Sequence, residues 1–594
     1  MTDTIHVSVA WPYANGDLHV GHLAGAYLPA DVFARYHRLK GDRVLMVSGS
    51  DSHGTPITVE ADKRGQTPRQ VFEHYHRRFL ETQQAIGISY DLFTHTDTEN
   101  HHRIARDFFL KLHAGEFIFR ETQRQLYSES EKRFLPDRYV EGTCPICGYA
   151  EARGDQCDRC GSLLDAVDLI NPRSKGDGSQ PVLRDTEHFF FDLGAFTDRL
   201  LPYLEAHAGH WRPNVVKFTR NYVDAGLKGR PVTRDIEWGI PVPLEGWEHK
   251  RLYVWFEAVM GYFTASVEWA QAVGQPQAWK DWWYDPQARI YNFIGKDNIP
   301  FHTVIWQAEL LGVDRIYDDD PSHHLNLPYD IPANEFMNVE GQKFSKSRNW
   351  AVWLPDILSR YDPDPIRYYV ASVMPESHDS DFSWADFVRR NNDELVATWG
   401  NLANRVLSFA YRHWDGHVPD PGELRPIDRQ ILEQIEGGFA SVGEHLEAVR
   451  LRAALGEAMG LARAVNGYLD RAPWFSVVKQ DKAAAATTVY TALSAINSLK
   501  VLLAPFLPFS SEKLHALLGY EQPLFGELKI VPRAEATREH EVLAYDGARA
   551  TGRWEPSTLA AGQRLQPPVP LYKKLDDSIV EQERAALGRP SDQG

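Results

Sequence analysis

The hydrophobic positions near the N-terminus follow first the period of a strand and then that of a helix. Apolar and polar residues alternate over residues 5–10, and a glycine-bearing loop and a helical stretch ending at Lys40 follow. A second apolar run spans residues 44–47. This order of strand, helix and strand is typical of a parallel, doubly wound sheet, whose ligands bind at the carboxyl ends of the strands.

Further along the chain the pattern changes several times. Residues 120–230 are rich in loops, cysteines and Pro/Gly punctuation, which indicates a domain inserted into the sheet domain. The α/β pattern then resumes, with strands expected at 252–256 and 290–294. After Asp393 the chain is almost entirely helical, and amphipathic stretches such as 449–469 predict a helical bundle.

These changes divide the chain into successive segments. They are 1–119, first half of a Rossmann-like sheet domain; 120–230, the insertion; 231–330, second half of the sheet domain; 331–393, a region with a lysine-rich loop; 394–550, the helical domain; and 551–594, an irregular tail that packs back on the body or hangs loose.

Composition narrows the class of protein only partly. A chain of 594 residues is too long for one core. The net charge of −17 argues against nucleic-acid binding, but a local reversal outweighs it: residues 211–234 hold one acid, Asp224, against six bases. These bases are Arg212, Lys217, Arg220, Lys228, Arg230 and Arg234. Without a membrane-length apolar run or a signal peptide, we expect a cytoplasmic protein.

The four cysteines form two CxxC pairs, Cys144/Cys147 and Cys157/Cys160, each followed by a glycine (Gly148 and Gly161). This spacing is typical of one tetrahedral Zn²⁺ bound by four thiolates. Because no ligand position remains for an activated water, the ion would be structural. Two disulfides, four unrelated thiols or a free-standing zinc-ribbon nucleic-acid binder are the alternatives, but the pairs occupy a small part of the chain.

Two short motifs carry the chemistry. In the first, His19-Val20-Gly21-His22, two imidazoles and a glycine stand at the start of the helical stretch, where backbone and ring N–H groups meet phosphate oxygens. The second, Lys343-Phe344-Ser345-Lys346-Ser347, is a short cationic loop after Gly341. Its two lysines would meet the same phosphates from the opposite side.

Together the two motifs resemble the signature pair of class I aminoacyl-tRNA synthetases. Further segments resemble methionyl-tRNA synthetase within that class. They are 10–16 (AWPYANG), 51–57 (DSHGTPI), the cysteine pairs, 233–241 (TRDIEWGIP) and 253–258 (YVWFEA). The resemblance runs from the N-terminus to at least Trp474. It implies a ligase that joins L-methionine to tRNA(Met), initiator and elongator, by way of methionyl-adenylate.

The resemblance implies a methionine pocket with a carboxylate for the substrate ammonium group, Asp51, and polarizable aromatic walls. The residues expected to line it are Ala10, Trp11, Tyr13, Asp51, Trp255, Ala258, Tyr262, His302 and Trp306. On the residues alone, these aromatic side chains would be ordinary core.

It also implies an ATP site, with Mg²⁺ accompanying the nucleotide. The catalytic residues would be His19, His22, Lys343, Lys346 and Arg234. The ATP-binding set would be His19, Gly21, His22, Gly295, Asp297, Lys343, Ser345 and Lys346, with Asp297 on the ribose hydroxyls. Residues 331–393 would contact the tRNA stem.

In the helical half, Asn401 and Arg405 stand four residues apart on one helix face, and Trp474 follows Pro473. By resemblance these three residues read the CAU anticodon, because Arg and Asn bond base edges and an indole stacks on a base. No appended oligonucleotide-binding domain follows, so we expect a monomer.

Three departures from the family pattern leave other interpretations open. Phe344 stands where many relatives carry methionine, Val259 where proline is common and Glu257 where aspartate is common. A specialised or inhibitor-resistant paralogue, a ligase for a neighbouring aliphatic amino acid and a non-catalytic tRNA-binding paralogue are the alternatives. The intact set of histidines and lysines disfavours the last of these.

Overall fold

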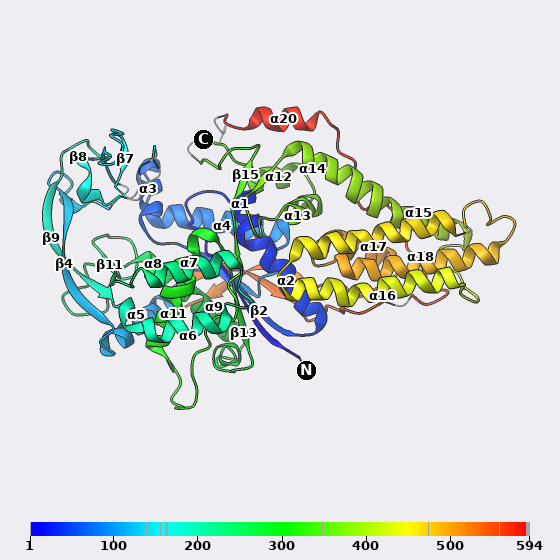
Figure 1. The fold of residues 1–594 in the computed structure, drawn as a ribbon, viewed down its shortest axis with the longest axis horizontal. Coiled ribbons are helices and arrows are strands. Elements are labelled where there is room, and N and C mark those ends of the chain that lie inside the picture. The colour runs from blue at the N-terminus through cyan, green and yellow to red at the C-terminus, as the bar shows by residue number, and fades with distance from the viewer. Residues whose placement is uncertain are drawn as a thin grey trace.

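The computed structural model describes residues 2–136, 139–154, 157, 159–160, 164–346, 348–472, 474–557 and 559–589. Ser347 of the lysine-rich motif, Gly161 after the second cysteine pair and Pro473 before Trp474 lie outside the described residues. Figure 1 shows an α/β body with the inserted domain at one end and the helical bundle at the other.

A seven-stranded sheet, in the order β14-β13-β1-β2-β3-β18-β17, forms the centre of the described catalytic body. Its first five strands are parallel: β1 (Thr4–Val9), β2 (Arg43–Ser50), β3 (Leu92–His95), β13 (Arg289–Gly295) and β14 (Ala333–Asn334). Val7 lies between Met46 and Tyr291 in the register. The strands expected at 5–10, 44–47 and 290–294 are therefore confirmed.

The sheet separates two hydrophobic clusters. On β2, Met46 faces the cluster that contains helix α2 (Leu28–Lys40), whereas Leu45 and Val47 face the cluster of helix α9 (Gly261–Ala272). Successive side chains of a strand point to opposite faces, so a continuous apolar run fills both layers. This is why the apolar run over residues 44–47 does not alternate.

The helical stretch that ends at Lys40 is one run with a π-helical segment inside it: α1 (Val20–His22), η1 (Leu23–Tyr27) and α2. The other helices of the body are α3 (Thr55–Arg64), α4 (Pro68–Ile86), α5 (Glu99–Ala114), α10 (Lys280–Trp283), η7 (Phe301–Ile305, also π-helical), α11 (Trp306–Val313), α12 (Leu354–Arg360), α13 (Pro363–Ser372) and α14 (Trp384–Arg390).

The strand expected at 252–256 is wrong. Strand β12 (Arg251–Leu252) pairs with β11 (Thr233–Arg234), and helix α8 (Val254–Glu257) follows at once. The helix starts because the N–H groups of Phe256 and Glu257 both donate to Tyr253 O. A run of five residues is too short for its hydrophobic pattern to distinguish a strand from a helix.

The inserted domain contains two small sheets. The long pair β4 (Ile118–Ser128) and β9 (Val182–Phe191) is flanked by β5 (Arg133–Phe134) and β10 (Arg230–Pro231). The sheet beside the cysteines consists of β6 (Val140–Thr143), β7 (Ala152–Arg153) and β8 (Ile170–Ser174). Helices α6 (Thr197–His207) and α7 (Pro213–Asp224) return the chain to the catalytic sheet, where Trp211 packs with Ile294.

The C-terminal half begins as the expected bundle. Its helices are η8 (Asn391–Gly400), α15 (Asn401–His413), α16 (Pro426–Glu447), α17 (Leu451–Arg471), α18 (Lys482–Leu503) and α19 (Pro508–Leu517). None of the helices in the described part of the chain has the length and apolarity to span a bilayer.

The bundle segment is not helical to its end, which corrects the expectation for 394–550. Strands β17 (Glu527–Ala534) and β18 (Glu539–Asp546) form a hairpin, and β18 pairs antiparallel with β3 at Leu543 and Phe93. Backbone groups at the sheet edge thereby find partners from a distant part of the chain.

The tail packs back on the body. Trp554 stacks edge-on against Tyr36 and Phe439, Tyr572 is buried, and helix α20 (Ile579–Ala586) lies beside α12 and α14 (Figure 1). The sequence left open whether residues 551–594 pack on the body or hang loose, and in the structure the described part of this segment packs on the body.

Candidate active site

A cavity of about 530 Å³ opens at the carboxyl ends of β1, β2 and β13. Ala10, Asp51 and Gly295 stand at these three strand ends. Of the expected site residues, the cavity is lined by Ala10, Trp11, Tyr13, His19, Gly21, His22, Asp51, Trp255, Ala258, Tyr262, Gly295, Asp297, His302 and Lys343. The fold therefore brings residues of both motifs and all the expected methionine residues except Trp306 to one place.

The two histidines of the first motif have defined tautomers. His19 Nδ1 accepts from Gly21 N at 3.0 Å, and His22 Nδ1 accepts from His19 N at 3.2 Å, a reciprocal cap at the start of α1. Burial is the main cause that lowers the pKa of His19, and the neighbouring His22 lowers it further. Burial is also the main cause that lowers the pKa of His22 to about 4, and the charge of Lys346 adds to it. Neutral rings that accept at Nδ1 carry their proton at Nε2, so each ring offers an N–H donor.

The lysine-rich loop lies over these histidines. The Phe344 ring stacks on His19 with centroids 3.8 Å apart, and Lys343 also lines the cavity. Lys346 Nζ donates to Asn15 O, and Ser345 pairs with Trp350 through backbone hydrogen bonds. Phe344 is therefore in direct contact with a signature histidine, which the sequence did not indicate.

Asp51 is a buried carboxylate, 4% exposed, at the end of β2. Burial and the nearby negative charge of Glu257 raise its pKa. Asp51 accepts the N–H of His53 at 3.2 Å but forms no ion pair with any described residue. A buried carboxylate that faces a cavity and forms no ion pair is a site for a positively charged ligand group.

Glu257, one of the departures, has a structural role behind Asp51. Its carboxylate accepts from His53 Nδ1 at 2.8 Å and from His101 Nε2 at 2.7 Å. Burial raises the pKa of Glu257, but the charge of His53 and the two hydrogen bonds outweigh it and bring the pKa down to about 2. The longer side chain of glutamate spans the two imidazoles.

Aromatic rings form the opposite wall of the cavity. Trp255 stacks on Phe301 at 4.4 Å between centroids and meets Tyr13 edge-on at 5.9 Å. Tyr262 and His302 are joined by a hydrogen bond of 2.7 Å between Oη and Nε2. Such ring edges and faces suit a polarizable thioether.

Four expected site residues do not line this cavity. Trp306 is fully buried behind the wall, 6.4 Å from Tyr262 between centroids, because it fills the core under α11. Arg234 stacks on Tyr253 at 3.8 Å and lines the neighbouring cavity. Ser345 and Lys346 belong to the loop beside the cavity.

The sequence missed several lining residues. Tyr27 comes from η1, Asn298 ends the short 3-10 helix η6 (Lys296–Asn298), and Phe301 begins η7. Met337 comes from β15 (Met337–Val339), directly before the lysine-rich loop. A π-helical turn has no sequence period of its own, whereas the position just before the loop was a usable signal for Met337.

The four cysteines gather at the inserted domain. The Sγ atoms of Cys144 and Cys160 are 3.9 Å apart, those of Cys147 and Cys157 are 3.6 Å apart, and all four lie within 4.8 Å of one another. Metal–sulfur bonds of about 2.3 Å place the corners of a tetrahedron about 3.8 Å apart. No disulfide joins these four thiols. The cluster is therefore a metal site in its geometry and donor set.

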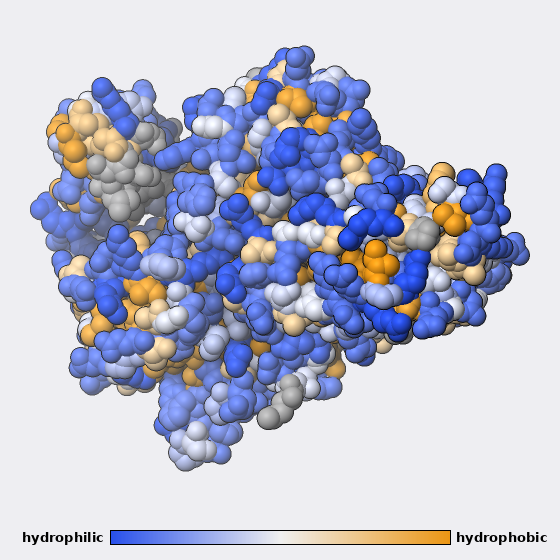
Figure 2. Space-filling model, turned by 45° about the vertical axis from the view of Figure 1, so that its right-hand side comes forward, coloured by the Kyte–Doolittle hydropathy of each residue, from blue (hydrophilic) through white to orange (hydrophobic). Residues whose placement is uncertain are grey.

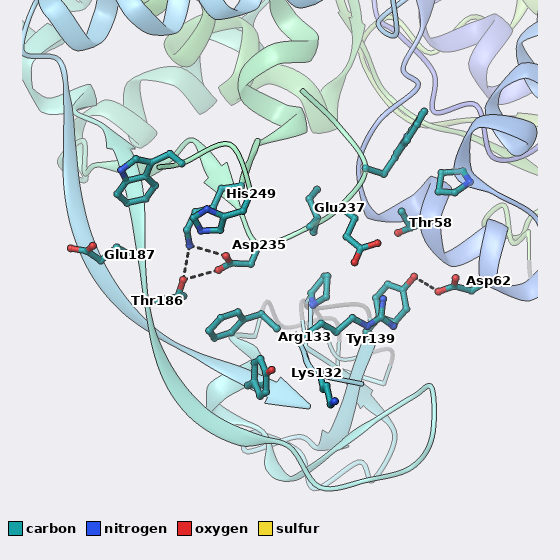
Figure 3. Close-up of a pocket in the computed structure, with 18 of the residues that line it drawn as sticks. Thr58, Asp62, Lys132, Arg133, Tyr139, Thr186, Glu187, Asp235, Glu237 and His249 are labelled. Atoms are coloured by element: carbon teal, nitrogen blue, oxygen red, sulfur yellow. Dashed lines mark hydrogen bonds and ion pairs between the residues drawn. The ribbon is translucent and has the colours of Figure 1, made fainter. Parts of the chain in front are cut away.

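A larger cavity of about 850 Å³ lies between the inserted domain and the catalytic body (Figure 3). Lys132 and Arg133 line it on one side and Glu237 on the other, and Lys250 Nζ bonds Asp235 Oδ1 at 2.7 Å at its edge. Figure 2 shows a mostly hydrophilic face with a hollow beside the inserted domain at the upper left.

This larger cavity is linked to the first one. A third cavity shares Phe134, Pro136 and Ile236 with the larger cavity, and Tyr13 and Trp255 with the first. The lining residues thus run without interruption from the inserted domain to the aromatic wall.

The expected anticodon residues lie in the helical bundle. Asn401 and Arg405 are exposed on α15, and Arg405 Nη2 donates to Asn466 Oδ1 at 2.9 Å. Trp474 is half-buried against Phe409, whereas the next ring, Phe475, is 71% exposed. The bundle therefore presents an amide, a guanidinium and an exposed ring in its described part.

In the basic stretch 211–234, some side chains are bonded within the fold and others are exposed to solvent. Arg212 is tied to β14 through Ala333 O at 3.0 Å and Asn334 Oδ1, whereas Lys217 and Arg220 are exposed on α7. Only part of the local positive charge faces solvent.

A parallel sheet with a helix-capping histidine pair and a lysine-rich loop at one cavity defines a class I aminoacyl-tRNA synthetase. Residues 5–407 match the family described as tRNA synthetases class I (M), and residues 418–543 match the anticodon binding domain of methionyl tRNA ligase. The chain belongs to the methionyl-tRNA synthetase family, and its reaction is the ATP-dependent ligation of methionine to tRNA.

Relatives in sequence belong to the same family, and a solved structure has a similar fold. The chain is 61% identical to the methionine–tRNA ligase of Thermomicrobium roseum over 590 residues and 54% identical to that of Roseiflexus castenholzii over 601, each match covering 99% of both chains. Its fold is similar to that of Mycobacterium tuberculosis methionyl-tRNA synthetase in complex with methionyl-adenylate, with a TM-score of 0.74, 24% identity and coverage of 96% of this chain and 100% of the other.

Because two histidines are buried, we expect the free energy of unfolding to fall in mild acid. Burial lowers the pKa of His302 and of His76 to about 4, from the ordinary 6.5 of the unfolded chain. Their contribution to stability is complete above the unfolded pKa and is lost as the pH falls from about 6.5 towards 4, by about 1.4 kcal/mol per pH unit for each group. We expect the calorimetric unfolding midpoint to fall across this window.

The variant His302→Gln isolates one of these groups. Glutamine keeps an acceptor for Tyr262 and a donor for Asn298 O, the two partners of the imidazole, but takes up no proton. Its midpoint should fall less steeply with pH than that of the wild type. A slope equal to the wild-type slope would contradict the assignment.

Proposed function

We propose that methionine and ATP react in the 530 Å³ cavity, and that Asp51 is the residue that orients the amino acid. The observation that carries this is a buried carboxylate that forms no ion pair with any described residue and faces an aromatic wall. The ammonium group of methionine would supply that partner. Tyr262, His302 and Trp255 would then surround the thioether.

Activation transfers an adenylyl group. A carboxylate oxygen of methionine attacks the α-phosphorus of ATP, the bond to the bridging oxygen breaks, and pyrophosphate leaves. The ribose hydroxyl at the 3′ end of tRNA then attacks the carbonyl carbon, loses its proton and releases AMP. Catalysis of the first step depends on fixed donors around the phosphates.

The His19 and His22 Nε2–H groups are proposed as donors to the phosphates from one side, and Lys343 and Lys346 from the other. Lysine at the loop acts as a mobile point charge, which suits a leaving pyrophosphate. Mg²⁺ accompanying ATP would add charge neutralisation on the phosphate oxygens.

Adenosine binding is proposed at the end of β13. Gly295 supports this because an added Cβ would lie 2.8 Å from Asp297 Oδ1, so the glycine keeps the backbone open there. Asp297 would accept from the ribose hydroxyls. Arg234, from the neighbouring cavity, would reach the substrate only on the side where tRNA arrives.

The linked cavities support a route for the 3′ end of tRNA. They combine basic side chains such as Lys132 and Arg133 with rings such as Phe134 and Trp247. Single-stranded RNA binds to surfaces of this kind through its phosphates and bases.

The proposal predicts amino-acid-dependent pyrophosphate exchange. Wild-type protein should exchange pyrophosphate into ATP with methionine and not with leucine, norleucine or isoleucine. Lys346→Ala should lower kcat by about 10²–10³-fold, because one fixed donor to the developing charge is lost. The matched control is Lys63→Ala, an exposed lysine whose charge also acts on Lys346.

Three results would contradict these assignments. Exchange supported equally by leucine would show that the cavity does not select methionine. An unchanged kcat in Lys346→Ala would remove the loop from the mechanism. A protein inactive with every amino acid would be the non-catalytic or repurposed paralogue.

The cysteine cluster is proposed to bind one structural Zn²⁺. The sulfur separations and the set of four thiolates support zinc, and reduced thiols fit the cytoplasm. The domain around the cluster has a small core of its own, so the metal would contribute much of its stability.

Elemental analysis tests this assignment. Wild-type protein should contain about one zinc per chain, and Cys157→Ser should lose it, because three thiolates bind far more weakly than four. In the wild-type protein Cys157 is buried, so removal of the metal with a chelator should also expose its thiol to thiol reagents. Full zinc retention in Cys157→Ser would overturn the ligand set.

The bundle residues Asn401, Arg405 and Trp474 are proposed to read the anticodon. Base stacking on an indole is worth about 1–3 kcal/mol, so Trp474→Ala should reduce kcat/KM for tRNA by about ten- to a hundredfold. Pyrophosphate exchange, which does not use tRNA, should be unchanged. Equal losses in both assays would assign Trp474 to folding rather than to tRNA binding.

A further inference from the structure

The loop that carries Lys343 and Lys346 begins and ends in unusual backbone conformations. Glu340 has φ 47° and Gly341 has φ 74° at its start, and Asn349 has φ 48° at its end. A residue with a side chain rarely adopts the left-handed region unless its surroundings hold it there. Both ends of the loop are in fact held by the same distant segment, residues 579–589.

At the start of the loop, the contact is an ion pair. Arg584 Nε and Nη2 each lie 2.8 Å from Glu340 Oε2. The other oxygen, Glu340 Oε1, accepts from Trp384 N at 2.7 Å. The Glu340 carboxylate is thus shared between α20 and α14.

At the end of the loop, the contacts are hydrogen bonds to the chain that follows α20. Gly588 N donates to Asn349 O at 3.1 Å, and Asn349 Nδ2 donates to Arg589 O at 2.6 Å. Asn349 Oδ1 in turn accepts from Trp353 Nε1 at 2.8 Å, and the Trp353 ring meets His19 edge-on. This end of the loop is therefore connected to the first signature motif.

Helix α20 has an anchor of its own, independent of the loop. Glu583 is buried and accepts from Arg360 Nε at 2.8 Å and from Tyr361 Oη at 2.7 Å. The chain before it is fixed to the bundle, since Asn392 and Leu575 exchange two hydrogen bonds. In Figure 1, α20 lies across the side of the body that carries α12 and α14.

We propose that residues 579–589 are a positioning element for the lysine-rich loop. By holding Glu340 and Asn349, the segment fixes the two ends between which Lys343 and Lys346 project, and so sets where these lysines meet the phosphates. The inference rests on the proposed phosphate-binding role of the two lysines. None of the residues 579–589 touches the cavity itself.

Two pairs of proteins test the proposal. Deletion of residues 588–594 removes both contacts to Asn349 and leaves α20 in place, and deletion of 591–594 is its control. Arg584→Ala removes the contact to Glu340, and Gln582→Ala, an exposed residue on the same helix, is its control. Pyrophosphate exchange, methionine affinity by equilibrium dialysis and the rate of tryptic cleavage after Lys343 and Lys346 are measured for each protein.

We expect deletion of 588–594 and Arg584→Ala each to lower kcat by about tenfold, because a displaced lysine weakens charge stabilisation. Methionine affinity should stay at the wild-type value, and tryptic cleavage in the loop should be faster. The controls should match the wild type in all three measurements.

An unchanged kcat in both test variants overturns the proposal. So does a fall in kcat that is matched by an equal fall in methionine affinity, because that result would mark general destabilisation. The tryptic measurement requires no activity. If the wild type showed no exchange, the proposed function would fail. A wild-type rate of tryptic cleavage in both test variants would separately disprove that residues 579–589 hold the loop.

Discussion

The buried ion pair between Arg367 and Asp31 determines how the catalytic sheet meets the helical bundle. Arg367 Nη2 lies 2.6 Å from Asp31 Oδ2, and neither side chain is exposed. The same guanidinium donates to Phe506 O and Pro505 O at 3.0 Å and to Gly87 O at 3.3 Å. A buried guanidinium is tolerated only when its donors are paired, so this set of partners ties three segments of the chain together.

The relative placement of the two signature motifs follows from this junction. Asp31 is on α2, whose N-terminal extension carries His19 and His22, and Arg367 is on α13, which follows the lysine-rich loop. The junction therefore fixes the elements that bear the two motifs relative to each other. With the bundle joined at the same point, the proposed sites of adenylate formation and anticodon binding share one scaffold.

Much of the site could be read from the sequence, because its residues stand at strand ends and helix starts that local patterns mark. The cysteine pairs, Asp51 after β2 and the histidines before the first helix are of this kind. What the sequence could not give depends on non-local pairing. The β17–β18 hairpin reaches β3 across more than half of the chain, and Pro532 in β17 fits only an edge strand. The π-helical turns that bring Tyr27 and Phe301 to the cavity have no sequence period.

The most direct test of the account is a crystal structure of the protein with a non-hydrolysable methionyl-adenylate analogue. The account predicts the ammonium group on Asp51, the thioether beside Tyr262 and His302, and the phosphate mimic within reach of His22 Nε2 and the lysine-rich loop. An ammonium group bound away from Asp51, or an adenosine outside the cavity at the end of β13, would contradict it.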